Sequence, residues 1–172
     1  MLLESPLFRE GEEAVKEPAL PIPEGLTIER VQDRDYDWCA RLMAGSEPWI
    51  TLRRDLEACH AALRRPGSEL FLARERGGPR GFILIHPYGC AGSPYIASVA
   101  VAEGARGRGV GTQLIAFAER RMAGRRFIFL CVSSFNRRAQ EFYSRLGYGR
   151  VGEIPDYVVE GHSEILLCKR LP

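Results

Sequence analysis

The sequence predicts one α/β (α+β) domain, built on a mixed, mostly antiparallel sheet of about seven strands with about four helices. Three features of the chain predict it. Short β-branched runs alternate with helical periodicity in the order β-α-α-β-β-β-α-β-α-β-β. Two apolar runs, 96–101 and 127–132, flank a single helix, which is the pattern of a parallel β-α-β crossover. The strands at 69–75 and 81–86 are joined by a hairpin turn and the last two strands by a loop, which favours antiparallel pairing of each pair.

Length and composition indicate one ordinary globular domain. The chain has 172 residues, of which 45% are hydrophobic and 27% charged. A net charge of +2 gives no bulk attraction to nucleic acid. No apolar run approaches the roughly 20 residues of a membrane span, and the first residues are acidic where a signal peptide needs an apolar stretch. We therefore expect a cytoplasmic protein with no membrane partner.

Five cysteines are scattered along the chain without a CxxC pair: Cys39, Cys59, Cys90, Cys131 and Cys168. This spacing argues against a metal site, and the odd count argues against a disulfide framework. Cys131 and Cys168 lie within apolar strands, where a cysteine usually packs as a small hydrophobic residue.

The first half of the chain predicts an arm followed by the start of the domain. Residues 1–25 are proline-rich and lack periodicity, so the domain is expected to span 26–172. Alternating, helical and turn patterns then predict, in order, a strand at 26–31, helices at 36–43 and 49–63, a hairpin of strands at 69–75 and 81–86, and a glycine-rich connection at 87–94. Asp33 or Asp35 is expected to cap the first helix.

The second half carries the crossover. The run at 96–101 predicts a buried strand, and helical spacing from Leu114 to Met122 predicts a helix that ends at Gly124. The run at 127–132 is apolar at every position, which predicts a strand buried on both faces. A helix at 139–146 and two last strands, at 148–154 and 164–171, complete the prediction.

Between the buried strand and the helix lies a loop rich in glycine and arginine. Its residues 103–111 read EGARGRGVG. Glycines let backbone N–H groups turn inward, and the free N–H groups at a helix start attract anions. The loop fits neither GxxxxGK[ST] nor GxGxxG. It matches R-x-x-G-x-G, with Arg106, Gly109 and Gly111 at the fixed positions.

This strand, loop and helix resemble the acetyl-CoA-binding motif of the GNAT superfamily of N-acetyltransferases. Residues 136–148, NRRAQEFYSRLGY, look like the downstream GNAT motif N-x-x-A-x-x-[FL]-Y-x-x-[LA]-G-[FY]. The resemblance covers Glu69 to the C-terminus by motif, and the chain from Leu26 by element order. Within the superfamily the pattern is closest to the ribosomal-protein-alanine N-acetyltransferase type.

The resemblance implies a GNAT acyl-CoA N-acyltransferase fold and the cofactor acetyl-CoA, with coenzyme A as product. It implies a cofactor site made of a strand edge, the loop and two side chains of the second motif: Val99, Ala100, Val101, Arg106, Gly107, Arg108, Gly109, Val110, Gly111, Thr112, Asn136 and Tyr143. The strand edge would pair with the pantetheine arm, and the loop amides would hold the diphosphate. Tyr143 would point its hydroxyl at the thioester sulfur.

Acetyl transfer to an amine also needs a stabilised oxyanion and a tolerable leaving group. A backbone N–H near Val99 is the expected oxyanion donor. Tyr143 is the expected catalytic residue, a general acid acting chiefly as a hydrogen-bond donor. Its reference pKa of about 10 exceeds the value of about 8.5 for a thiol.

The general base is where the sequence departs from the pattern. Enzymes of the ribosomal-protein-alanine type carry a glutamate at the position that Cys131 occupies in this chain. A thiol in an apolar strand stays protonated, so Cys131 cannot replace that base. Ser98, where other relatives carry a carboxylate, is a poor base. The candidates left open are a water chain, an amine that arrives neutral, or one of four side chains: Glu47, His86, Glu153 and Asp156. Trp49, Tyr157 and His162 lie on segments that border the acceptor pocket in this superfamily.

The resemblance therefore predicts an acetyl-CoA-dependent N-acetyltransferase. Its acceptor is a primary amine on a small molecule, an amino acid, a protein N-terminus or a lysine, attacked directly in a ternary complex. The alternative is a catalytically weak GNAT-fold module that binds CoA or acetyl-CoA as ligand or sensor. An RNA-binding Arg-Gly patch is disfavoured, because such segments are longer and disordered. The expected partners are the cofactor and the amine, with no nucleic acid, and homodimerisation is left open.

Overall fold

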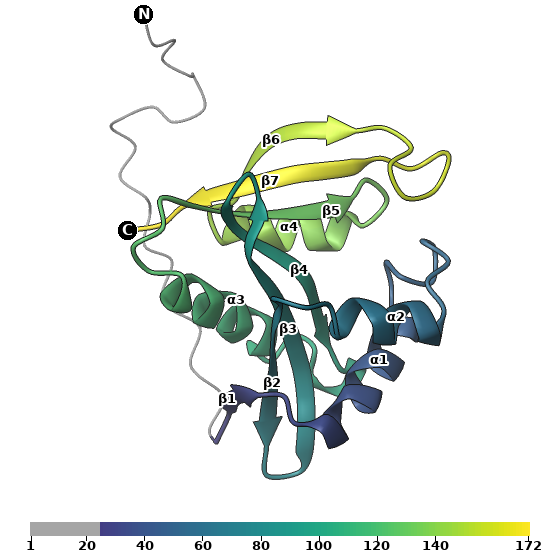
Figure 1. The fold of residues 1–172 in the computed structure, drawn as a ribbon, viewed down its shortest axis with the longest axis vertical. Coiled ribbons are helices and arrows are strands. Elements are labelled where there is room, and N and C mark those ends of the chain that lie inside the picture. Colours follow the sequence, from purple (N-terminus) through teal and green to yellow (C-terminus); the bar gives the residue numbers. More distant parts are fainter. Residues whose placement is uncertain (1–24) are drawn as a thin grey trace, which may run out of the picture.

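A computed structural model describes residues 25–172, so the predicted arm lies outside the described residues except for Gly25. Seven strands form one sheet in the order β1-β2-β3-β4-β5-β7-β6. They are β1 (Thr27–Arg30), β2 (Glu69–Glu75), β3 (Gly78–Cys90), β4 (Ser93–Val101), β5 (Phe127–Ser133), β6 (Gly149–Ile154) and β7 (Glu164–Arg170). The helices are α1 (Tyr36–Ala44), α2 (Leu56–Leu63), α3 (Val110–Arg121) and α4 (Arg137–Arg145). The predicted mixed sheet with four helices is confirmed (Figure 1).

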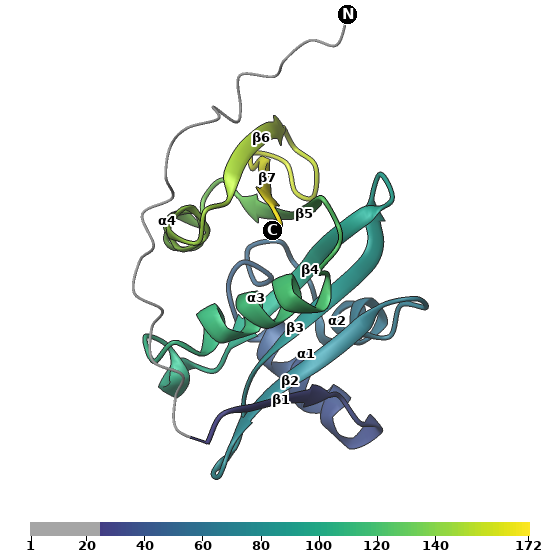
Figure 2. The same ribbon diagram turned by 90° about the vertical axis from the view of Figure 1, so that its left-hand side faces the viewer.

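The helices cover the sheet in two layers, each with its own apolar core. The helices α3 and α4 pack on one face, where Leu114 and Ile115 meet Ile83 and Ile128. The helices α1 and α2 pack on the other, where Cys39 and Cys59 join a second cluster. Successive strand residues point to opposite faces, so each central strand feeds both cores. Figure 2 shows α3 on one side of strands β2–β4 with α1 and α2 on the other. No helix within 25–172 is long and apolar enough to cross a bilayer.

The sheet divides where its one parallel pair begins to separate. The strands β4 and β5 pair only through Tyr95 with Phe129 and Ile96 with Leu130. On its other edge β4 pairs with β3, and there the register skips Ala97, because Leu84 faces Ser98 while Ile85 faces Ile96. An extra residue of this kind bends a strand. Beyond the bulge β4 and β5 diverge, which leaves a fork between two halves of the sheet (Figure 1).

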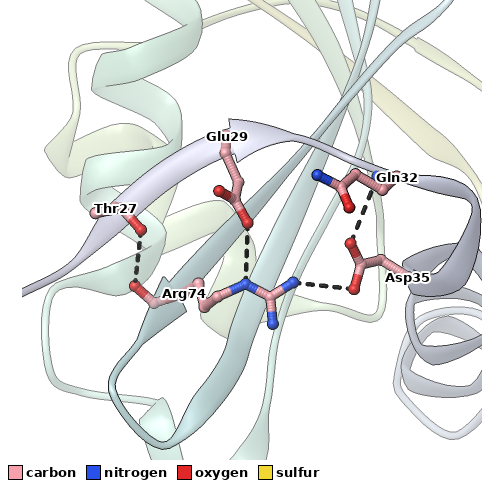
Figure 3. A network of polar contacts seen from close by, with 5 residues as sticks. All are labelled: Thr27, Glu29, Gln32, Asp35 and Arg74. Atoms are coloured by element: carbon pink, nitrogen blue, oxygen red, sulfur yellow. Dashed lines mark hydrogen bonds and ion pairs between the residues drawn. The ribbon is translucent and has the colours of Figure 1, made fainter.

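A polar network fixes β1 and the start of α1 to β2. The Arg74 side chain donates to Glu29 Oε1 at 3.0 Å and to Asp35 Oδ1 at 2.9 Å. The other Asp35 oxygen accepts from the backbone N–H of Gln32 at 3.4 Å, and the Thr27 hydroxyl donates to the Arg74 carbonyl at 3.4 Å (Figure 3). Since α1 leads directly into the segment 45–54, this network also helps to place one wall of the cavity described below.

Several predicted boundaries differ from the structure, each for a local reason. The second helix begins at Leu56 and not near Trp49, because Arg53 has φ +54° and Asp55 caps the helix through Ala58 N at 2.8 Å. The expected connection at 87–94 is mostly strand, since β3 and β4 meet in a hairpin whose turn, Ala91–Gly92, has positive φ at both residues. The strand β5 is not buried on both faces: its residues alternate between buried and half-buried, because one face opens toward the fork.

Candidate functional site

A cavity of about 1300 Å³ runs along the fork. One end is lined by the glycine loop and the start of α3, and the middle by β4, β5 and α4. The other end is lined by the segment 45–54 and by Tyr157 and Val158 of the β6–β7 loop. Among the residues described, one hollow therefore joins the anion-binding motif to both predicted acceptor-side segments.

The glycine loop presents a row of unused backbone donors at its end of the cavity. The amide of Arg106 donates to Glu103 O, and that of Gln113 donates to Gly109 O. Between them, the six amides from Gly107 to Thr112 have no acceptor within residues 25–172. Gly107 and Gly109 have φ of +74° and +83°, in the left-handed region that favours glycine. Unpaired N–H groups at a helix start attract anions, so this loop is a candidate anion site.

The last glycine of the motif, Gly111, lies close to two other elements, although a Cβ there would make only ordinary van der Waals contacts. A Cβ placed on Gly111 would lie 3.4 Å from Phe142 Cζ and 3.7 Å from Val101 Cγ2. Gly111 thus lies where α3 approaches both the end of β4 and the helix α4. A larger side chain at this position would fill space at the cavity wall.

The two arginines of the loop are held by the protein itself. The Arg106 Nε donates to the carbonyl of Val101 at 3.1 Å. The Arg108 guanidinium lies 3.6 Å from Glu75 Oε2, which also accepts from Arg80 Nε at 3.0 Å. Both loop arginines are exposed and bring positive charge to this end of the cavity.

The expected strand edge has no strand partner on the β5 side, although the Val101 carbonyl accepts from Arg106 Nε. Val99, Ala100 and Val101 pair with β3 on one side, but neither they nor any residue beyond Ile96 pairs with β5. All three line the cavity. An unpaired strand edge can add an extended ligand as a further strand.

Asn136 and Tyr143 lie on the opposite wall, at the start and on the inner face of α4. The Asn136 Oδ1 accepts from Ala139 N at 3.2 Å and so caps the helix, and its side-chain amide has no recorded partner among the described residues. Tyr143 packs at ring-centroid distances of 5.2 Å from Phe142 and 5.8 Å from Tyr148. Burial raises the pKa of its hydroxyl to about 12, so Tyr143 stays a proton donor at all physiological pH values.

Comparison with known proteins gives the family. Residues 30–148 match the family model described as Acetyltransferase (GNAT) family, which is well over half of the chain. The chain belongs to the GNAT family of acetyltransferases. It is 36% identical over 84 residues to an uncharacterised N-acetyltransferase of Methanocaldococcus jannaschii, a match over 47% of this chain and 54% of that protein. The chain therefore spans about half the length of that relative.

Solved structures with the same fold include several acetyltransferases. One is an aminoglycoside 6'-N-acetyltransferase complexed with coenzyme A, with TM-score 0.68, 19% identity and coverage of 85% of this chain and 98% of that one. Another is NAA60 of Arabidopsis thaliana in complex with a bisubstrate analogue, with TM-score 0.70, 14% identity and coverage of 85% and 98%. A third is an acetyltransferase of Thermus thermophilus, with TM-score 0.67, 21% identity and coverage of 85% and 97%. At these identities the likeness concerns the fold alone.

The four side chains considered as bases from the sequence are unequally placed in this GNAT domain. Glu153 and Asp156 are exposed and do not line the cavity: Glu153 pairs with Arg150, and Asp156 accepts from Gly161 N at 2.7 Å. Glu47 lines the cavity but is exposed, and it accepts from the Thr51 hydroxyl at 3.0 Å. His86 lines the cavity with its Nε2 buried and unpaired, and burial followed by the charge of Arg65 lowers its pKa.

A fifth candidate base, which the sequence motifs do not mark, lines the cavity of this GNAT domain. Glu164, the first residue of β7, is 7% exposed. Its Oε1 accepts from the Ser133 hydroxyl at 2.6 Å, and burial raises the pKa of its carboxyl despite this hydrogen bond. In the sequence it is one glutamate at the start of a strand, separated by 31 positions from Ser133. Only the pairing of β5 with β7 brings the two together.

Proposed function

We propose that this GNAT-family protein is an acetyl-CoA-dependent N-acetyltransferase that acts on a primary amine. The observation that carries the proposal is the row of six unpaired amides, Gly107 to Thr112, at one end of a cavity that continues along an open strand edge. A diphosphate fits the amides, and an extended amide-containing arm fits the edge. The cofactor-binding domain in this proposal spans residues 26–172.

The residues present fit the groups of acetyl-CoA in order along the cavity. The loop from Arg106 to Thr112 would hold the diphosphate, with Arg106 and Arg108 contributing charge. The edge of Val99, Ala100 and Val101 would pair with the pantetheine arm. The free side-chain amide of Asn136 is suited to a hydrogen bond with the same arm. When bound, acetyl-CoA supplies an activated acetyl thioester.

Tyr143 would lie beside the sulfur of that thioester. Its pKa of about 12 is roughly three units above that of a thiol, so full proton transfer to a thiolate is unfavourable. A hydrogen bond from the Tyr143 hydroxyl that strengthens as negative charge grows on the sulfur needs no such transfer. We therefore assign Tyr143 the role of hydrogen-bond donor to the leaving group.

The far end of the cavity is the proposed site of the acceptor amine. Trp49 is buried there, whereas Ile50 and Tyr157 are 54% and 65% exposed at its rim. Because the hollow is continuous, amine and cofactor can be present together, which supports direct attack in a ternary complex. Departure from the ribosomal-protein-alanine pattern at Cys131 leaves the acceptor open among small amines, amino acids, protein N-termini and lysines.

The test is to incubate the purified protein with acetyl-CoA and a panel of small amines, amino acids and peptides. Products are identified by mass spectrometry, and free thiol is measured in parallel. The proposal predicts N-acetylated product with one thiol released per acetyl group. Tight acetyl-CoA binding without any product would instead indicate a module that binds the cofactor as ligand or sensor.

A further inference from the structure

Glu164 is a buried carboxylate that no cation neutralises within the described part of the chain. Every other acid that the structure buries to a similar degree has such a partner: Asp35, 8% exposed, is paired with Arg74. For Glu164 the one recorded contact is the Ser133 hydroxyl on Oε1. Burying an unpaired ionised carboxylate is costly, and burial accordingly raises the pKa of the Glu164 carboxyl, so this group holds a proton more tightly than an exposed glutamate does.

The second oxygen of Glu164 is available to the cavity. Its Oε2 has no recorded hydrogen-bond partner among residues 25–172. Unlike the sealed, unpaired polar atoms of that range, Oε2 keeps some solvent-accessible surface. Glu164 itself lines the cavity. By contrast, His86 lines the same cavity, but its Nε2 is sealed from solvent. Of these two groups, the carboxylate is therefore the one that an incoming ligand can reach.

The strand register places Glu164 on the acceptor side of the fork. Its neighbour Ile165 belongs to the core under α3 and α4, so Glu164 points to the opposite face. Ser133 faces Glu164 directly across β5 and β7. Tyr143 packs against the α3 and α4 core. The carboxylate and the tyrosine hydroxyl thus approach the fork from opposite faces of the sheet.

No ion pair with Glu164 and no positive charge acting on it is recorded within the described residues. From β4 the Tyr95 ring, and from β5 the Cys131 thiol, feel its negative charge, which contributes to the raised pKa of each. From β6 the cross-strand neighbour is Ile154. His86, on β3, stays neutral because its pKa is lowered. Glu47, Arg54 and Arg65 also line this cavity, but none of them is recorded in a hydrogen bond or ion pair with Glu164. A cationic ligand that reaches Glu164 would therefore meet a carboxyl group that no cation already pairs.

We propose that Glu164 binds the ammonium form of the acceptor and accepts its proton, with Ser133 orienting the carboxylate. The inference rests on the proposed function and assigns the base that its chemistry needs. One proton passes from the ammonium nitrogen to Glu164 Oε2. The freed amine nitrogen bonds to the acetyl carbon, the carbon–sulfur bond breaks, and the second surplus proton of the nitrogen ends on the sulfur. Glu164 returns its proton to water. The substrate class is thus a strongly basic primary amine that is protonated at neutral pH.

The first test is the pH profile of Glu164→Gln, with the exposed Glu153→Gln as matched control. The wild type should lose activity at low pH as the Glu164 carboxylate takes up a proton. Glu164→Gln should lower kcat about 100-fold and remove this acidic limb, while Glu153→Gln keeps both. Circular dichroism and acetyl-CoA affinity, measured calorimetrically, should match the wild type for both variants.

A second variant separates catalysis from structure. Ser133→Ala removes a hydrogen bond that lowers the pKa of the Glu164 carboxyl. The acidic limb should therefore move to higher pH, by about half a unit to one unit.

A third readout is the acceptor itself. With an alkoxyamine analogue of the best acceptor, Glu164→Gln should lose much less rate, because such an amine is already neutral at pH 7 and needs no base to remove a proton before it attacks.

These outcomes decide the inference separately from the proposed function. A wild type that acetylates no amine overturns both. An active wild type overturns the inference alone if Glu164→Gln keeps the acidic limb, if His86→Gln removes it instead, or if the amine and its alkoxyamine analogue lose rate equally.

Discussion

Replacing Gly109 by alanine should weaken acetyl-CoA binding by a predictable amount. Gly109 precedes the first residue of α3 and has φ +83°. A residue with a Cβ in this conformation costs about 1–2 kcal/mol. The loop lies at the surface, so the free protein can relax out of the strained turn. The cost then falls on binding, because the amides from Gly107 to Thr112 converge only when this turn is kept.

A cost of this size corresponds to a loss of about 5- to 30-fold in affinity. Isothermal titration calorimetry with acetyl-CoA measures it directly. The matched control is Gly104→Ala, in the same segment, since Gly104 has no positive φ and a Cβ there meets nothing within 4 Å. The control should bind as the wild type does. Wild-type affinity in Gly109→Ala, or an equal loss in both variants, would refute the reasoning.

Three further changes test other parts of the structure. Tyr143→Phe should lower kcat at least tenfold and leave acetyl-CoA affinity unchanged. Because the pKa of Tyr143 is about 12, the wild type should lose no activity through ionisation of this hydroxyl below about pH 11. Asn136→Ala should remove the α4 cap and cost about 1 kcal/mol, a fall in Tm of about 2–4 °C, which Asn136→Asp should largely avoid in thermal unfolding. Glu164→Gln should unfold at a higher temperature than the wild type at pH 8, with the gap closing toward pH 4. The folded protein holds the Glu164 proton more tightly than the unfolded chain, so wild-type stability falls as pH rises through that window.

The sequence marked the residues that line the loop end of the cavity more fully than those that line its other end, for a physical reason. Holding a diphosphate requires glycines at fixed spacing beside a helix start, and such a requirement leaves a local pattern at Gly107, Gly109 and Gly111. The proposed base leaves no local pattern. Glu164 acquires its burial and its Ser133 contact only when β5 and β7 pair. The side chains that the sequence offered as candidates were Glu47, His86, Glu153 and Asp156, and the two that lie nearest to Glu164 along the chain, Glu153 and Asp156, are outside the cavity.

The fold was predictable where the hydrophobic period was strong. All seven strands and four helices were expected, and most errors fell at turns. The segment 49–55 has helical composition, but the positive φ of Arg53 and the Asp55 cap delay the helix to Leu56. The uniform apolar run of β5 suggested burial on both faces. Its half-buried positions reflect the fork, which depends on the bulge at Ala97 and is not encoded within β5 itself.

The central claim is that the amides of Gly107 to Thr112 hold the diphosphate of acetyl-CoA. Titration of the ¹⁵N-labelled protein with coenzyme A, followed by amide ¹H–¹⁵N NMR, tests it most directly. We predict that these six resonances shift together, in a saturable way, and by more than those of the distant β1 and α1. A titration that saturates while these six resonances stay in place would contradict the claim.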